Sequence, residues 1–320
     1  MRQGMRSARV MTFTSEQDRI LWPTLARSRS GQVVLLSSCD VQEIRRWDVF
    51  TGRMLWCSDG GWPVNALAVA SPPDGSLVVA AAMEDGVLRL DALTGEELDG
   101  PEMAGGDTVW DVATGLLPDG RAFIAGAGHC NFRVYLWDAA TGAPLGPPLL
   151  GHTAPVKAVT ATTLPDGTAL VATEDESGRI LRWNAATGQP YGAPIHGPGD
   201  TSMRLVSLAL NDGRIMLVSL DMHGTLSRWN AVTGEPIGPL LHPGPDTSLT
   251  AASAAGGGVL FTAPYDGQTT LWDAVSGEPI GTPLPGSGPA ALACFDGSVR
   301  VATRTADAEM TIRRLFDPLI

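Results

Sequence analysis

Residues 137–183 read WDAATGAPLGPPLLGHTAPVKAVTATTLPDGTALVATEDESGRILRW, and this stretch decides the fold. It begins at Trp137 and ends at Trp183, which takes the same place in the pattern as Trp137. Each tryptophan precedes a Thr-Gly pair by four residues, at Thr141 and at Thr187. With changes, the pattern recurs along the chain every 43 to 47 residues. A period of about 20 to 50 residues indicates a solenoid, a propeller or another repeat array.

The repeat has two markers that alternate along the chain. The first is a tryptophan or its replacement, then Asp or Asn, then Thr-Gly or Ser-Gly. It occurs at Trp47, Leu90, Trp137, Trp183, Trp229, Trp272 and Leu315. The second is an Asp-Gly turn or an equivalent pair, which readily takes the positive-φ conformations of a tight hairpin turn. It begins at Ser30, Asp74, Asp119, Asp166, Asp212, Gly257 and Asp296.

Three strands and one irregular outer segment are expected in each repeat. An apolar, β-branched run such as 169–172 follows each Asp-Gly turn, and its continuous apolarity predicts burial on both faces. A more alternating strand, such as 179–183, then leads to the tryptophan. Beyond the Thr-Gly turn the chain is rich in proline, as in 144–149, which restricts this segment to a sheet edge. No long helical period or linker interrupts the pattern, so we expect one domain over residues 1–320.

Four strands per repeat, with Trp-Asp closing the third strand, resemble the WD-repeat family of β-propellers. Gly151-His152 matches the Gly-His element of that family. The resemblance implies an all-β, seven-bladed β-propeller of four-stranded antiparallel blades, in which Trp47, Trp137, His152, Trp183, Trp229 and Trp272 are structural residues. The expected blades span about 17–60, 61–103, 104–151, 152–198, 199–243, 244–285 and 286–320.

The resemblance also implies a His–Ser/Thr–Asp–Trp hydrogen-bond set in each blade. With the aspartate expected six residues before the tryptophan, Asp266 fits before Trp272, whereas Ser177, His223, Asn131 and Val41 stand at the corresponding positions. We therefore expect packed aliphatic strands to stabilise the blades. The last repeat ends after its third strand, and residues 8–14 contain a spare β-like segment. The family resemblance implies that this segment supplies the missing outer strand and closes the ring, which removes exposed strand edges.

Composition narrows the function. The net charge of −12 and pI of about 4.8 argue against a nucleic-acid partner and fit a partner that is basic. Four cysteines without metal-type spacing indicate free thiols in a reducing compartment. The sequence shows no signal peptide and no apolar run long enough to cross a membrane, so a cytoplasmic location is expected. Lys157 is the single lysine, and this arginine bias suggests a GC-rich, actinobacterium-like bacterial source.

No catalytic motif stands out. There is no Gly-x-Ser-x-Gly elbow and no Walker loop, and Gly126-Ala-Gly128 lies between two strands without the helix that a dinucleotide fingerprint needs. No cofactor or metal is expected, because five scattered histidines do not provide convergent ligands.

Acidic and aromatic residues gather in the turns and loops expected on one face of the ring, which is the predicted binding face. The candidate residues are Trp62, Asn65, Glu84, Asp85, Trp110, His129, Lys157, Asp175, Asp221, His223, Tyr265 and Asp266. Trp62, which precedes Pro63, is expected to be partly exposed. Exposed aromatics among carboxylates suit a basic peptide or protein.

The leading hypothesis is a non-enzymatic scaffold that binds a protein or peptide on this face. The alternative is a small-molecule-binding or catalytic propeller with an axial site, for which the acidic turns, His129 and His223 are the candidate groups. A third possibility is a sensor part of a larger system that is encoded separately. The same residues could instead solvate the ring, with the tryptophans packed into it.

Overall fold

The computed structural model describes residues 11–13, 20–27, 31, 33–39, 42–49, 51–59, 61, 63–197, 202–244, 247–254, 257–264, 270–283, 287–295, 298–304 and 310–314. Strands dominate this part of the chain, and the strands form seven antiparallel sheets. Within these residues no helix is long and apolar enough to cross a membrane.

The first four sheets follow the chain in order. Sheet 1 contains β2 (Ile20–Arg27), β3 (Val33–Cys39), β4 (Glu43–Trp47) and β5 (Met54–Asp59). Sheet 2 contains β6 (Val64–Ala70), β7 (Val78–Met83) and β8 (Gly86–Asp91). Sheet 3 contains β9 (Val109–Leu116), β10 (Ala122–Gly128) and β11 (Val134–Asp138). Sheet 4 contains β12 (Val156–Thr163), β13 (Ala169–Asp175), β14 (Arg179–Asn184) and β15 (Ile195–His196).

The remaining sheets continue the pattern, and the last one includes a strand from the beginning of the chain. Sheet 5 contains β16 (Ser202–Ala209), β17 (Ile215–Asp221) and β18 (Leu226–Asn230). Sheet 6 contains β19 (Thr247–Ala254), β20 (Gly257–Pro264) and β21 (Thr270–Asp273). Sheet 7 contains β22 (Ser287–Phe295), β23 (Ser298–Arg304), β24 (Met310–Arg314) and β1 (Met11–Phe13). β1 pairs antiparallel with β24, opposing Met11 to Ile312.

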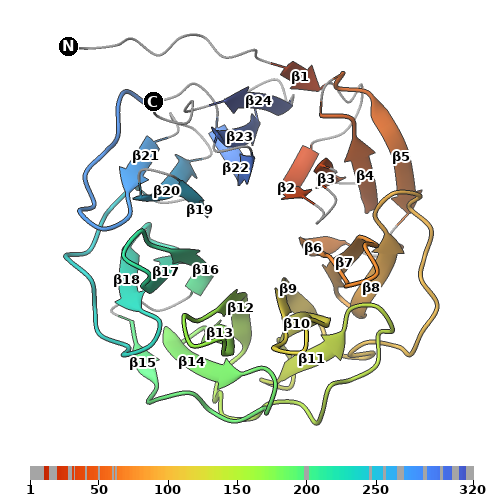
Figure 1. Ribbon diagram of the computed structural model, residues 1–320, viewed down its shortest axis with the longest axis horizontal. Coiled ribbons are helices and arrows are strands. Elements are labelled where there is room, and N and C mark those ends of the chain that lie inside the picture. The colour runs from red at the N-terminus through yellow and green to blue at the C-terminus, as the bar shows by residue number, and fades with distance from the viewer. Residues whose placement is uncertain are drawn as a thin grey trace.

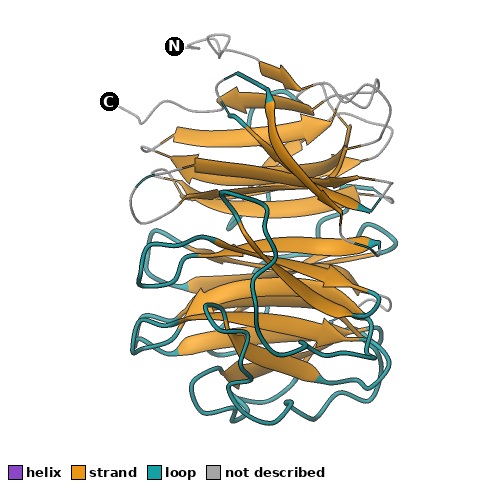
Figure 2. Ribbon diagram, turned by 90° about the vertical axis from the view of Figure 1, so that its right-hand side faces the viewer, coloured by secondary structure: helices purple, strands orange, loops and turns teal. Residues whose placement is uncertain are grey.

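The sheets are arranged around a common centre as in a β-propeller, with the first strand of each sheet nearest that centre (Figure 1). Consecutive first strands contact one another, and β2 also contacts β22. Seen from the side, the strands run between the two ends of the ring, and the loops gather at those ends (Figure 2).

Burial of the second strands fits their apolar sequence. Every residue of β7, β10 and β13 is buried, which confirms the expectation of burial on both faces for these strands. Apolar clusters fill the spaces between sheets. In the cluster between sheets 3 and 4, Phe123 and Leu136 pack with Leu181 and Trp183. Such burial is worth about 1.5 to 3 kcal/mol for each large side chain and provides the main stabilisation of the fold.

The proline-rich outer segments confirm the prediction of irregular pairing. The expectation of such a segment in every repeat was wrong for sheet 1, where residues 52–60 contain no proline and β5 pairs with β4 along its length. Trp137, Trp183 and Trp229 pair with Pro144, Pro190 and Pro236 only through isolated bridges. Proline lacks the N–H that a regular ladder requires, so the chain makes intermittent contact with the third strand in place of a continuous fourth strand.

The two ends of the ring differ in their turns. We call one the glycine-turn end, because the Asp-Gly and Thr-Gly turns lie there. Gly120 and Gly167 of the Asp-Gly turns have φ of 87° and 86°, as the hairpin prediction requires. We call the other the bulge end, because the first strands begin there and β6, β9, β12 and β16 each carry a one-residue β-bulge close to their first residue. The turns between second and third strands lie at this end.

Sheet 4 contains a complete His–Thr–Asp–Trp hydrogen-bond set. His152 Nδ1 lies 2.8 Å from Asp175 Oδ2, and His152 Nε2 lies 2.8 Å from Thr173 Oγ1. Trp183 Nε1 donates to Thr173 Oγ1 at 3.1 Å. The expected position of the carboxylate was therefore wrong: Asp175 precedes Trp183 by eight residues, because the turn from 176 to 178 must fit between the strands. Sheet 1 has the equivalent of the tryptophan bond of this set, since Trp47 Nε1 donates to Ser37 Oγ at 2.8 Å.

An arginine immediately before the first marker connects neighbouring sheets. We call this contact the arginine clasp, and it is formed by Arg46, Arg89, Arg182 and Arg228. In the clasp of sheet 4, Arg182 Nη1 donates to Ala231 O and Val232 O of the next sheet at 2.9 and 2.8 Å, and Nη2 donates to Ala193 O at 2.8 Å. Five fixed N–H groups allow one guanidinium to satisfy several turn carbonyls at once. Burial lowers the pKa of Arg182.

Candidate binding face

The predicted binding face corresponds to the bulge end, and most of its residues can be located. Trp62, Tyr265 and Asp266 lie outside the described residues. Asn65, Trp110 and Lys157 are the extra residues of the bulges in β6, β9 and β12. Met203 has the same place in β16, and sequence reasoning missed it. A bulge re-aims a side chain relative to the regular strand, so the bulge positions are suited to present side chains at this end.

Trp110, Lys157 and Glu176 form a compact cluster across the junction between sheets 3 and 4. Lys157 Nζ lies 3.8 Å from the centre of the Trp110 ring and 3.1 Å from Glu176 Oε1. Trp110 remains 38% exposed. Because the ring face attracts a cation and the carboxylate pairs with it, Lys157 holds the indole in one orientation.

His129 packs edge-on against Trp110, with ring centres 5.4 Å apart. Burial lowers the pKa of His129, and the neighbouring Lys157 adds to this effect. The imidazole is therefore mainly neutral at pH 7. Its Nδ1 atom is buried and has no hydrogen-bond partner. Neutral His129 serves as a flat support beside Trp110.

Asp111, next to Trp110, is 5% exposed and contacts two other first strands. Val159 N of β12 donates to Asp111 Oδ2 at 3.0 Å. Arg204 Nη1 of β16 lies 3.3 Å from Asp111 Oδ1. Burial raises the pKa of Asp111, while Arg204 and the amides of Val159 and Val112 oppose this increase. Sequence reasoning did not identify Asp111, because nothing in its spacing marks it as different from any polar residue in a strand.

Two of the acidic residues predicted for this face are engaged within their own turns. Asp175 is a correction to the predicted face: its carboxylate is buried in the sheet 4 hydrogen-bond set, where it also accepts from Ser177 N and Arg179 N. Asp221 is half-buried and accepts the amides of His223 and Thr225 at 2.9 and 2.7 Å. Both carboxylates hold their own turns, so they are not free to receive a partner.

Three of the other predicted residues are exposed. Glu84 and Asp85 form the short turn between β7 and β8, where Asp85 Oδ1 accepts Gly106 N at 2.9 Å. His223 is exposed in the turn after β17. Asn65 is half-buried, and its Nδ2 donates to Val109 O at 2.9 Å, which ties the bulge of β6 to the start of β9. Among the described residues, the exposed acidic side chains predicted for this face are Glu84 and Asp85 of sheet 2.

Phe132, Met203 and Met222 are exposed apolar side chains that the sequence did not predict for this face. Phe132, in the turn between β10 and β11, is 36% exposed and has a φ of 57°. Positive φ is unusual for an aromatic residue and costs conformational energy. Met203 is 57% exposed and Met222 is 48% exposed, both at the bulge end of sheet 5. Bulges and turn lengths depend on pairing register, which the single sequence does not specify.

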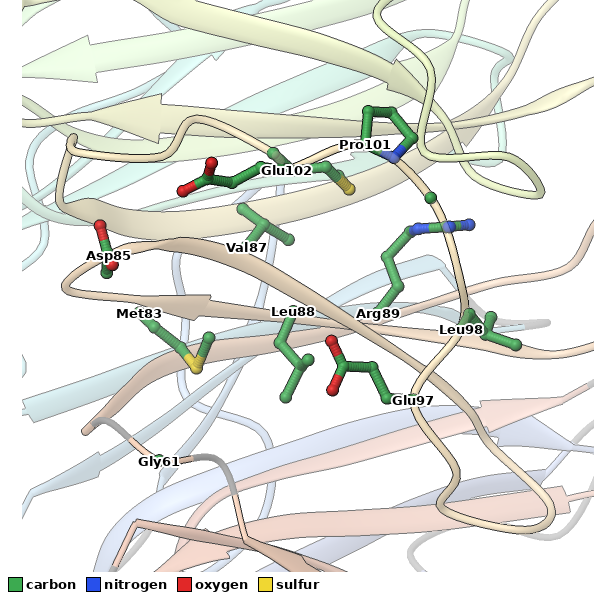
Figure 3. Close-up of a pocket in the computed structure, with 12 residues that line it drawn as sticks. Gly61, Met83, Asp85, Val87, Leu88, Arg89, Glu97, Leu98, Pro101 and Glu102 are labelled. Carbon is green, nitrogen blue, oxygen red and sulfur yellow. The ribbon is translucent and has the colours of Figure 1, made fainter.

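A shallow pocket of about 490 Å³ lies at the outer edge of β8. There the segment that carries Pro101 and Glu102 arches past Val87 and Arg89 of β8 (Figure 3). Asp85, Glu97 and Glu102 line the pocket, but Arg89 is engaged with the carbonyls of Ala139 and Ala140. Among the residues that the structure describes, no three His, Cys, Asp or Glu side chains are placed to hold a metal ion.

The sequence matches a family model described as outer membrane protein assembly factor BamB over residues 4–193, more than half of the chain. By structure, the chain is similar to the crystal structure of the computationally designed Ika8 protein, with a TM-score of 0.60 and 20% identity over 95% of this chain and 98% of the other. At that identity the likeness shows the fold alone. No curated protein matches the sequence.

The family match corrects the sequence-based resemblance. What the WD-repeat pattern shares with the matched family is the β-propeller repeat, and the match is to the BamB type, not to WD repeats specifically. The chain belongs to the outer membrane protein assembly factor BamB family of β-propeller repeat proteins.

Proposed function

We propose that the chain is a non-enzymatic scaffold that binds a protein or peptide at the bulge end of its ring. One observation carries the proposal: Trp110, Phe132, Met203 and Met222 are exposed at the same end of sheets 3 and 5. Lys157 and Glu176 of sheet 4 lie between these two apolar groups. Exposed apolar side chains that gather on one face beside polar residues are typical of protein interaction sites.

Trp110 is the expected anchor of the interface. Tryptophan is enriched among residues that dominate binding energy, because a large rigid ring buries much area with little loss of side-chain freedom. Lys157 and His129 already fix the orientation of the indole, so little ordering remains to be done when a partner binds. The methionines adapt their shape and suit a partner whose surface is not flat.

A basic partner remains the favoured kind. Glu84 and Asp85 are exposed beside the apolar groups, and the whole chain carries a net charge of −12. Complementary charge would speed association and orient the partner with its basic residues over sheet 2. The description of the family, an assembly factor, also suits a protein that works by holding other proteins.

Affinity capture with matched variants tests the proposal. Wild type, Trp110→Ala with Met203→Ser, and a control at the opposite end, Leu116→Ser, are compared as baits in lysate of the source organism. Leu116 is 40% exposed, similar to Trp110, but lies at the glycine-turn end. Proteins retained by wild type and the control should be lost from the double variant. Equal retention by all three baits would refute the bulge end as the binding face.

We further propose that the seven sheets are the blades of a closed ring and that β1 closes it as the fourth strand of sheet 7. The pairing of β1 with β24 and the contact of β2 with β22 support this. The His152–Thr173–Asp175–Trp183 set supports a WD-like character for sheet 4. Deleting residues 1–14 should lower the unfolding midpoint markedly, whereas an unchanged midpoint would exclude closure by β1.

The cytoplasmic location also remains a proposal. Among the described residues, Cys57 and Cys130 are free thiols, which suits a reducing compartment. The family description instead refers to the outer membrane. Cell fractionation with an antibody to the native protein separates the two locations, and recovery in an envelope fraction would overturn the cytoplasmic assignment.

A further inference from the structure

Asp111 lies where three consecutive first strands meet. It directly follows the bulge residue Trp110 in β9, and it accepts from the backbone of β12 and pairs with a side chain of β16. Its partner Arg204 directly follows the bulge residue Met203, while Val159 N lies two residues beyond the bulge residue Lys157. One carboxylate thus connects the bulges of β9, β12 and β16, whose residues lie at the proposed binding face.

The register explains how one side chain reaches so far. Asp111, Ala158 and Arg204 are equivalent, because each is the first residue after the bulge in its strand. Ala158 is small and fully buried, so Asp111 and Arg204 can approach each other across β12. β12 is the innermost strand of sheet 4, and its free edge leaves Val159 N available to a neighbour.

Stability alone does not account for a carboxylate at this position. Sheets 2 and 4 have Ala66 and Ala158 at the equivalent place, so the fold tolerates a small apolar residue there. A buried ion pair often stabilises a protein no more than apolar side chains of similar volume would. Burial raises the pKa of Asp111, which means that the surroundings penalise its charged form. The carboxylate of Asp111 therefore contributes more to the positions of the neighbouring strands than to the stability of the fold.

We propose that Asp111 is a positioning residue that holds Trp110, Lys157 and Met203 as one preorganised binding arc. The inference rests on the proposed function, because it states how that face keeps its shape. Without the carboxylate, the three bulges lose their common acceptor and move independently, so a partner has to order them on binding.

The experiment follows the arc in the free, full-length protein. Hydrogen exchange is measured at the Val159 amide and in the segments 109–113, 156–160 and 202–206. Labelling of Lys157 by an amine-reactive reagent gives a second readout, since Lys157 is the only lysine. Asp111→Asn should accelerate exchange at Val159 and labelling of Lys157 by about tenfold or more, the loss expected for a charge-assisted hydrogen bond. The unfolding midpoint should change little.

Two variants of Arg204 keep the proposal testable if Asp111→Asn does not fold. Arg204→Met should reproduce the local acceleration in the segments around Trp110 and Met203, and Arg204→Lys, which keeps the charge, should restore most of the wild-type protection. Unchanged exchange at Val159, or acceleration of equal size in all sheets, would overturn the positioning role. The capture experiment with Trp110 variants tests the binding face, whereas hydrogen exchange in the free protein tests the role of Asp111. A failure of one proposal is therefore distinguishable from a failure of the other.

Discussion

The two ends of the ring follow different rules. At the glycine-turn end, Asp91, Asp138, Asn184, Asn230 and Asp273 each accept the amide of the residue three positions later in the same kind of turn. At the bulge end the turns between second and third strands cover 84–85, 129–133, 176–178 and 222–225, so no two of these have the same length. The glycine-turn end therefore repeats one kind of turn, whereas at the bulge end the length of the turn changes from sheet to sheet.

This difference suggests separate roles: the glycine-turn end connects neighbouring sheets, and the bulge end presents a surface. The arginine clasp acts at the glycine-turn end, where the turns of sheets 2, 3, 5 and 6 offer their carbonyls to the arginine of the preceding sheet. A change there disturbs two sheets at once. The described turns and bulges at the bulge end accept no clasp, so Phe132 and Met222 in the turns and Trp110 in a bulge can be exposed there without loss of the architecture. Because of this contrast, we propose that the binding function lies at the bulge end.

Removing a clasp should have the largest effect on stability. Arg182→Leu leaves three turn carbonyls without their donor, and we expect a loss of about 2 to 4 kcal/mol in the free energy of unfolding. Arg182→Lys should restore only part of it, because an ammonium cannot reproduce the planar fork. Urea denaturation measures both variants. Arg214→Ala is the control, an exposed arginine of the same end paired with Asp212, and it should leave stability unchanged. A similar result for Arg182→Leu would show that the clasp is dispensable.

The hydrogen-bond set of sheet 4 is the exception at the bulge end, because it fixes that end with buried groups. Burial alone would raise the pKa of Asp175, but hydrogen bonds from His152 and Ser177 outweigh it, and the pKa is lowered. Asp175→Asn should cost about 1 to 3 kcal/mol at neutral pH. Since the folded pKa is below the unfolded value, this contribution is complete above pH about 4 and disappears as the pH falls further. Denaturation at pH 7 and pH 3 tests the sign; a constant difference would contradict it.

Glycine substitutions separate backbone strain from crowding at the glycine-turn end. Gly167 has a φ of 86° and open space where a Cβ would stand, so Gly167→Ala should cost about 1 kcal/mol through backbone strain alone. Gly142 has a φ of 74°, and its Cβ would lie 2.8 Å from Arg89 Nε in the clasp. Gly142→Ala should therefore cost more than Gly167→Ala. Thermal unfolding of both variants makes the comparison, and equal losses would mean that Arg89 moves aside without cost.

The sequence predicted the repeating parts of the molecule well, because those parts obey local rules. Burial of β13, the positive φ of Gly167 and the broken pairing at Pro190 all follow from residue type and spacing. The carboxylate of the hydrogen-bond set was misplaced, since counting back from Trp183 requires the length of the turn in between. Trp110 and Lys157 were identified as candidates, but their contact depends on two bulges in different sheets. Met203 and Asp111 become meaningful only when the register is known.

Substitutions of exposed residues at the bulge end should have the smallest effect on the free energy of unfolding. Trp110→Ala removes a ring that is 38% exposed and one cation–π contact, and we expect a loss of no more than about 1 kcal/mol. Met203→Ser, at 57% exposure, should change stability even less. Urea denaturation of the two single variants beside Arg182→Leu provides the measurement. If Trp110→Ala destabilised the protein as much as loss of the clasp, the indole would be part of the architecture, and its exposure would no longer indicate a binding face.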